Sequence, residues 1–155
     1  MSKRVALGCD HAVYSAHNEI IDIIKNTGVV SEVQYMGPPS AASVDYPDYA
    51  ARVCEAILNG EADTGILVCG TGIGMSIAAN KFNGIRAALC YDHVTAQLCR
   101  QHNDAHIVCI GVRTSGMEII RDIVTTFLTT EFSTEGRHGG RVAKISAIES
   151  KQMKE

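Results

Sequence analysis

Short apolar runs alternate with stretches of helical periodicity along most of this 155-residue chain. The apolar runs predict strands at 5–8, 29–36, 65–68, 85–89 and 107–110. The periodic stretches predict helices near 13–26, 47–59, 73–81, 92–101 and 116–128. Strands that alternate with helices in this way are typical of right-handed crossovers and a parallel sheet covered on both faces. We therefore predict an α/β fold: a Rossmann-like three-layer sandwich around a five-stranded parallel sheet.

The last segment, 133–155, departs from this alternation. A glycine-rich basic loop leads into an amphipathic stretch in which Ile145 and Ile148 share one face. We expect an extra C-terminal helix that docks on the body of the protein or on a partner subunit. The chain has no internal repeat, low-complexity tract or linker, so we expect residues 1–155 to form a single domain.

Composition narrows the function classes. A hydrophobic content of 46% and a charged content of 20% are typical of a soluble globular protein. The net charge of −3, the 5% aromatic content and the absence of Trp argue against nucleic-acid binding. No apolar run approaches the roughly 18 residues of a membrane span, and the first strand follows the N-terminus without a signal peptide. We expect a cytoplasmic protein without nucleic-acid or membrane partners.

The cysteines argue against a structural metal site. Six are present, at 9, 54, 69, 90, 99 and 109, and no two form a C-x-x-C pair. Cys54, Cys90, Cys99 and Cys109 lie in apolar contexts, so we expect them to be small buried hydrophobic residues. Cys69 differs because its neighbours are glycines.

The segment Asp63–Gly74 carries the strongest chemical signal. A buried-looking strand runs into Cys69 and then into a loop with glycine at 70, 72 and 74, before a predicted helix. Glycines allow backbone N–H groups to converge on an anion, and the helix N-terminus favours negative charge there. The same groups would favour the thiolate of Cys69. The spacing fits neither G-x-G-x-x-G nor a P-loop, and the alternative interpretation is a tight strand-to-helix turn.

Other polar residues follow the predicted strands, where ligands bind in parallel sheets. Asp10-His11 could be an acid–base or phosphate-binding pair, or could be merely hydrogen-bonded. Asp45, before Pro47, could orient a sugar or cap a helix. His102-Asn103 closes the fourth predicted helix, where capping competes with catalysis.

Two arginines near the C-terminal helix point to a phosphate. Arg137 and Arg141 are four residues apart at a predicted helix start, among flexible glycines. Guanidinium groups bind phosphate in a bidentate manner, so these two predict a phosphate site, and Arg113 is a third candidate. The alternative is a solvated basic loop.

Taken together, these motifs resemble ribose-5-phosphate isomerase type B, in the family that also contains galactose-6-phosphate isomerase. The resemblance runs nearly end to end. It is carried by the segments 8–11 (GCDH), 45–50 (DYPDYA), 69–81 (CGTGIGMSIAANK), 85–88 (IRAA), 100–105 (RQHNDA) and 132–141 (FSTEGRHGGR).

The resemblance implies an aldose–ketose isomerase of the non-oxidative pentose phosphate pathway that works through a cis-enediolate, without metal or cofactor. It implies Cys69 as the base, Thr71 as a hydroxyl that assists proton movement, and His102 as the group that opens the sugar ring. The family's substrate-binding positions correspond to Gly70, Gly72 and Gly74 in the anion hole, to Asp10, Asp45 and Asn103 at the sugar, and to His11, Arg113, Arg137 and Arg141 at the phosphate.

The resemblance also implies a homodimer, or a dimer of dimers, with each site shared between subunits. Cys69 and Met75 place the chain in the branch with a catalytic cysteine, since another branch has serine and glutamate there. The loop 36–44 is longer than the usual family pattern.

Two alternatives stay open. One is an isomerase of a six-carbon sugar phosphate, allose or galactose 6-phosphate. The other is a non-catalytic phosphate-ligand binding domain with a redox-active Cys69, for which Cys9 is a candidate resolving cysteine.

Overall fold

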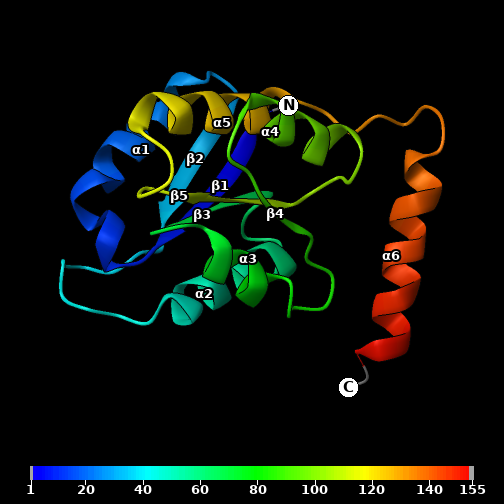
Figure 1. Ribbon diagram of the computed structural model, residues 1–155, viewed down its shortest axis with the longest axis horizontal. Coiled ribbons are helices and arrows are strands. Elements are labelled where there is room, and N and C mark those ends of the chain that lie inside the picture. The colour runs from blue at the N-terminus through cyan, green and yellow to red at the C-terminus, as the bar shows by residue number, and fades with distance from the viewer. Residues whose placement is uncertain (1, 154–155) are drawn as a thin grey trace.

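The computed structural model describes residues 2–153 and has a five-stranded sheet in which every strand is parallel (Figure 1). The order of the strands across the sheet is β2-β1-β3-β5-β4. Their bounds are β1 (Lys3–Cys9), β2 (Val30–Tyr35), β3 (Thr64–Cys69), β4 (Ala87–Leu89) and β5 (Ile107–Gly111). The predicted parallel sheet is confirmed.

Helices cover both faces of the sheet, which confirms the three-layer sandwich (Figure 1). One face packs against α1 (His17–Asn26), α4 (His93–Gln101) and α5 (Met117–Thr129), and the other against α2 (Tyr46–Leu58) and α3 (Ile73–Ala79). The central strand β3 is buried along its whole length. Its Ile66 and Val68 point to the first layer, and Leu67 and Cys69 point to the second. A strand buried on both faces needs a continuous apolar sequence, which is why β3 reads as one run.

Several element boundaries differ from the sequence-based prediction, and three of the larger differences have a local reason. The helix expected from residue 13 begins as the 3-10 turn η1 (His11–Ala16), because the Asp10 side chain accepts a hydrogen bond from the Ala12 amide at 3.0 Å. Helix α3 ends at Ala79, where the Asn80 side chain bonds both the N–H and the C=O of Ala87 at 2.9 Å. Strand β4 begins at Ala87 instead of 85, since the Arg86 amide donates to the His106 ring.

The extra C-terminal helix is α6 (His138–Gln152), and it stands beside the body of the protein (Figure 1). None of its residues is buried within the described range 2–153, and its Ile145 and Ile148 are 44% and 64% exposed. Glu149 ties it to the body by accepting a hydrogen bond from the Gly84 amide at 2.8 Å. No helix in the described range is both long and apolar enough to cross a bilayer.

Candidate active site

An open cleft of about 440 Å³ lies along the carboxyl ends of the strands, which we call the carboxyl edge of the sheet; the opposite side, at the amino ends of the strands, is the amino edge. The strand order reverses between β1 and β3, and the carboxyl ends of strands at such a switch point are where α/β proteins bind ligands. Six of the predicted site residues line the cleft: Asp10, Cys69, Gly70, Thr71, Gly74 and Arg113. The cleft therefore combines a thiol, a carboxylate, a guanidinium group and a glycine loop.

Cys69 ends β3, and its sulfur accepts a hydrogen bond from the Gly72 amide at 3.2 Å. Gly72 has a φ of +78°, a left-handed conformation that glycine adopts without steric cost. This turn folds the loop back over the sulfur, and the residue Cys69 as a whole is 5% exposed. The loop thus directs an N–H donor at the Cys69 sulfur.

Other amides of the loop are available to a ligand. The Ile73 amide donates to the Thr71 hydroxyl oxygen at 3.2 Å. The amides of Gly70, Thr71 and Gly74 donate to no acceptor within residues 2–153. These three residues line the cleft, so their amides are available to an acceptor atom of a bound molecule.

Arg113 and Asp10 bring opposite charges to the cleft. The Arg113 amide donates to the Gly70 carbonyl at 2.9 Å, and a Cβ at position 70 would lie 3.4 Å from Arg113 Cδ. The glycine therefore lets the arginine stem lie along the loop. Asp10 is 8% exposed and caps η1. Its neighbour His11 starts η1, and the His11 Nδ1 accepts a hydrogen bond from the Val44 amide at 3.1 Å.

Tyr46, Ile73 and Ile77 also line the cleft and were not among the predicted site residues. The Tyr46 ring covers Gly74, since a Cβ there would lie 2.5 Å from Tyr46 Cζ. Asp45, predicted near the sugar, is exposed at the N-cap of α2, and Tyr46 occupies the cleft beside it. The spacing of Ile73 and Ile77 on the helix after the glycine loop was an available signal, but apolar residues at helical spacing usually indicate core.

The four cysteines predicted to be small buried hydrophobic residues, at 54, 90, 99 and 109, are buried in the two apolar layers, which confirms that prediction. All six cysteines are free and buried. Cys9 packs in the layer of α1, α4 and α5, whereas Cys69 packs in the layer of α2 and α3. The sheet separates the two sulfurs, which disfavours Cys9 as a resolving cysteine for Cys69.

Four other predicted residues, His102, Asn103, Arg137 and Arg141, lie in a second group together with His138, and we call this group the amino-edge cluster. His102 is the C-cap of α4 and stacks on His138, with ring centroids 4.1 Å apart and planes within 10°. Arg137 is the N-cap of α6, and Arg141 lies in its first turn. Desolvation, His102 and the two arginines lower the pKa of His138 below 6.5. The cluster is cationic, which suits a phosphate.

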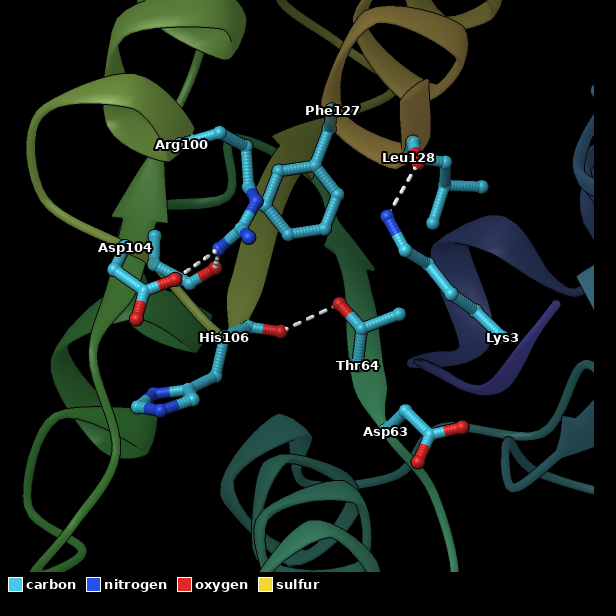
Figure 2. A pocket seen from close by; sticks show the side chains of 9 residues that line it. Lys3, Asp63, Thr64, Arg100, Asp104, His106, Phe127 and Leu128 are labelled. Atoms are coloured by element: carbon cyan, nitrogen blue, oxygen red, sulfur yellow. Dashed lines mark hydrogen bonds and ion pairs between the residues drawn. The ribbon is translucent and has the colours of Figure 1, made fainter. Parts of the chain in front are cut away.

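A tightly bonded turn, residues 100–105, carries His102 and Asn103; Figure 2 shows its Arg100 and Asp104. Arg100 Nη1 donates to Asp104 Oδ1 at 2.9 Å and to the Ala105 carbonyl at 2.6 Å. From the other side, Arg86 Nε donates to the Asn103 carbonyl at 3.0 Å. Asp104 is held at a φ of +46°, which is unusual for a residue with a side chain. These bonds fix the backbone that carries His102 and Asn103.

One chain does not bring the cleft and the amino-edge cluster together. Cys69 is in register with Gly111, at the carboxyl end of β5, while His102 and Asn103 precede the first residue of that strand. The four steps from Ile107 to Gly111 span roughly 13 Å at about 3.3 Å per residue. The predicted base, Cys69, and the predicted ring-opening residue, His102, therefore lie at opposite ends of the strands of the same sheet.

Comparison with known proteins gives a consistent result. The model of the Ribose/Galactose Isomerase family matches residues 5–145. The chain is 45% identical over 150 residues to ribose-5-phosphate isomerase B of Escherichia coli, covering 97% of this chain and 99% of the relative.

Solved structures agree. The type B ribose 5-phosphate isomerase of Leishmania infantum superimposes with a TM-score of 0.97 at 76% identity, covering 99% of this chain and 100% of the other. The type B enzyme of Trypanosoma cruzi gives a TM-score of 0.95 at 54% identity, with 99% and 100% covered. The sheet order, the cysteine loop at the switch point and these matches show that the chain belongs to the ribose/galactose isomerase family.

Proposed function

We propose that this chain, as a single sugar-phosphate isomerase domain over residues 1–155, interconverts ribose 5-phosphate and ribulose 5-phosphate through a cis-enediolate. The observation that carries the proposal is Cys69 beside three unpartnered loop amides within residues 2–153. Support also comes from relatives named ribose-5-phosphate isomerases that match nearly end to end. The reaction would serve the non-oxidative pentose phosphate pathway in the cytoplasm.

Cys69 would act as the base. In the open-chain aldose, its thiolate takes the proton from C2, the C2–H electron pair becomes the C1–C2 double bond, and the C1=O1 π pair moves onto O1. Once the O2 proton has passed to O1, the electron pair left on O2 forms the C2=O2 bond, and the C1–C2 π pair takes the proton from sulfur to C1, which gives the ketose and restores the thiolate. Such relay between adjacent carbons needs one base positioned between them.

The loop amides would hold the negative oxygen of the enediolate. Loss of one such donor typically raises the activation barrier by about 3–4 kcal/mol, so the loop should carry much of the rate enhancement. A proton must also pass from O2 to O1. The Thr71 oxygen already accepts from the Ile73 amide, which leaves its own O–H free to face the sugar oxygens.

A second copy of the chain would complete the site. Ring opening and phosphate binding are assigned to His102, Arg137 and Arg141, which lie a strand length from Cys69 in the same chain. A homodimer that sets the amino-edge cluster of one protomer at the cleft of its partner resolves this separation. The exposed Ile73 and Ile77 at the cleft and the uncovered apolar residues of α6 are suited to such a contact.

In this arrangement the phosphate would lie between His11 and Arg113 of one protomer and Arg137 and Arg141 of its partner. Asp10, Asp45 and Asn103 would contact the sugar hydroxyls. The two arginines of α6 are exposed in the single chain, where they are free to meet an anion.

The test is turnover by the purified chain, without added metal or nucleotide, on ribose 5-phosphate, allose 6-phosphate and galactose 6-phosphate. We expect turnover of the five-carbon substrate and little of the others. Preference for a six-carbon substrate would retain the mechanism and correct the specificity. No turnover of any of the three would favour a phosphate-ligand binding domain.

A further inference from the structure

The segment 36–44 crosses the carboxyl edge of the sheet between β2 and α2, and we call it the strap. It contains Pro38 and Pro39, and the function proposed above gives it no task. Its middle, residues 39–43, is exposed, whereas Pro38 is buried and Val44 is partly buried. The strap is thus fixed at both ends: one end is bonded to Tyr35, the last residue of β2, and the other to His11, which follows β1.

The first fastening runs through Tyr35. The Tyr35 hydroxyl donates to the Pro38 carbonyl at 2.8 Å, and the Cys9 sulfur lies 3.6 Å from the same hydroxyl. Because the single hydroxyl proton is used toward Pro38, the Cys9 thiol must be the donor to the Tyr35 oxygen. Burial raises the pKa of Cys9 to about 11, so that proton is present at neutral pH. The chain of bonds runs from Cys9 through Tyr35 to the strap.

Close packing keeps the Tyr35 ring in place. The ring stacks on His17 with centroids 4.4 Å apart, and a Cβ at Gly37 would lie 2.5 Å from the Tyr35 oxygen. The strap therefore turns directly over the ring, and only glycine permits this approach.

The second fastening bonds the strap to His11. The Val44 backbone N–H donates to His11 Nδ1 at 3.1 Å. A backbone N–H can only donate, so Nδ1 must be an acceptor without a proton. The hydrogen of the neutral imidazole is then on Nε2, which makes Nε2 a donor.

We propose that the strap is a positioning element for the phosphate: through Val44 it holds His11 as the neutral Nε2–H tautomer, and through Tyr35 it fixes the place of that bond. His11 then contacts the substrate as a neutral hydrogen-bond donor, and the arginines supply the positive charge. This inference rests on the proposed function, in which His11 touches the phosphate. Val44 and Tyr35 act through His11 and contact no substrate.

The tautomer can be read directly in the ligand-free protein by ¹⁵N NMR of the histidine side chains, with the His11 signals assigned by their loss in His11→Gln. We expect a pyridine-like Nδ1 and a pyrrole-like Nε2 at neutral to mildly alkaline pH. A proton on Nδ1, in either the other tautomer or the imidazolium, would overturn the proposal.

Affinity for inorganic phosphate tests the strap. Tyr35→Phe removes the bond to Pro38 but keeps the ring that stacks on His17, so we expect a folded protein. Its Kd for phosphate and its KM for ribose 5-phosphate should rise about three- to tenfold, as for loss of one neutral hydrogen bond, while kcat changes less than about twofold. Tyr14→Phe is the matched control, because the nearby Tyr14 hydroxyl bonds nothing within residues 2–153.

Equal phosphate affinity in the two tyrosine variants would refute the role of the strap. The tautomer and the phosphate Kd are both measured without turnover. Failure of the proposed isomerase activity would therefore be seen separately, as a protein with the expected tautomer and phosphate affinity that converts no sugar phosphate.

Discussion

The turn at Gly72 gives the sharpest single-residue prediction, since it sets both the loop and the donor to Cys69. In Gly72→Ala the added Cβ would lie 2.7 Å from Leu89 Cδ1 and 3.0 Å from the backbone N and C of Ile110. The leucine end can move, but Ile110 belongs to a central strand and cannot. The residue also keeps a φ of +78°, which disfavours any side chain.

These effects give a magnitude. The left-handed conformation costs about 1–2 kcal/mol for alanine, and overpacking of a filled site adds about 1–3 kcal/mol. We expect a loss of about 2–5 kcal/mol in the free energy of unfolding, which for a domain of this size lowers Tm by roughly 5–20 °C. If the backbone shifts instead, the Gly72 amide leaves the sulfur. Loss of a hydrogen bond to a charged group, about 1.5–3 kcal/mol, would lower kcat about 10- to 150-fold.

The assay combines thermal unfolding with steady-state kinetics on ribose 5-phosphate, with Gly116→Ala as the control. A Cβ at Gly116 meets nothing within 4 Å, and its φ is −72°. That variant should match the wild type in both Tm and kcat. A Gly72→Ala protein with unchanged Tm and kcat would refute the reasoning about this turn. A lower Tm with an unchanged kcat would show that the amide of Gly72 does not assist Cys69.

Two further predictions concern the amino edge. Arg137→Ala and Arg141→Ala should each raise KM more than they lower kcat, because phosphate contacts are largely shared by ground and transition states; a fall in kcat at constant KM would contradict this. Burial lowers the pKa of His106 in the folded protein below 6.5. The stability that depends on its neutral form is therefore fully present above pH 6.5 and is lost as the pH falls below 6.5. In urea unfolding between about pH 8 and about pH 5.5, His106→Asn should therefore lose less stability than the wild type, and equal losses would count against the assignment.

Much of the fold could be predicted because its signals are local. β3 is a continuous apolar run, and Gly28 and Gly60, with φ values of +76° and +75°, follow the ends of α1 and α2, where a left-handed glycine is common. The order of the strands could not be predicted. That β5 inserts between β3 and the short edge strand β4 depends on packing across the sheet, which periodicity along the chain does not encode.

The same division applies to the site. The Cys69 loop is contiguous in sequence, and Asp10 and Arg113 follow parallel strands, so their convergence at one edge follows from topology. Tyr46 and Ile77 were missed because cleft-facing apolar residues look like core residues in a sequence. His102 follows a helix and precedes a strand, which places it at the amino edge. Only the resemblance to the family joined it to Cys69.

The measurement that tests the shared site most directly is subunit mixing. Cys69→Ala and His102→Asn should each be nearly inactive alone. After joint unfolding and refolding, half of the dimers should be mixed, and each mixed dimer should hold one intact site, so activity should recover to about a quarter of the wild-type value. Native mass spectrometry would confirm that mixed dimers form. Mixed dimers without recovered activity would contradict a site built from Cys69 of one protomer and His102 of its partner.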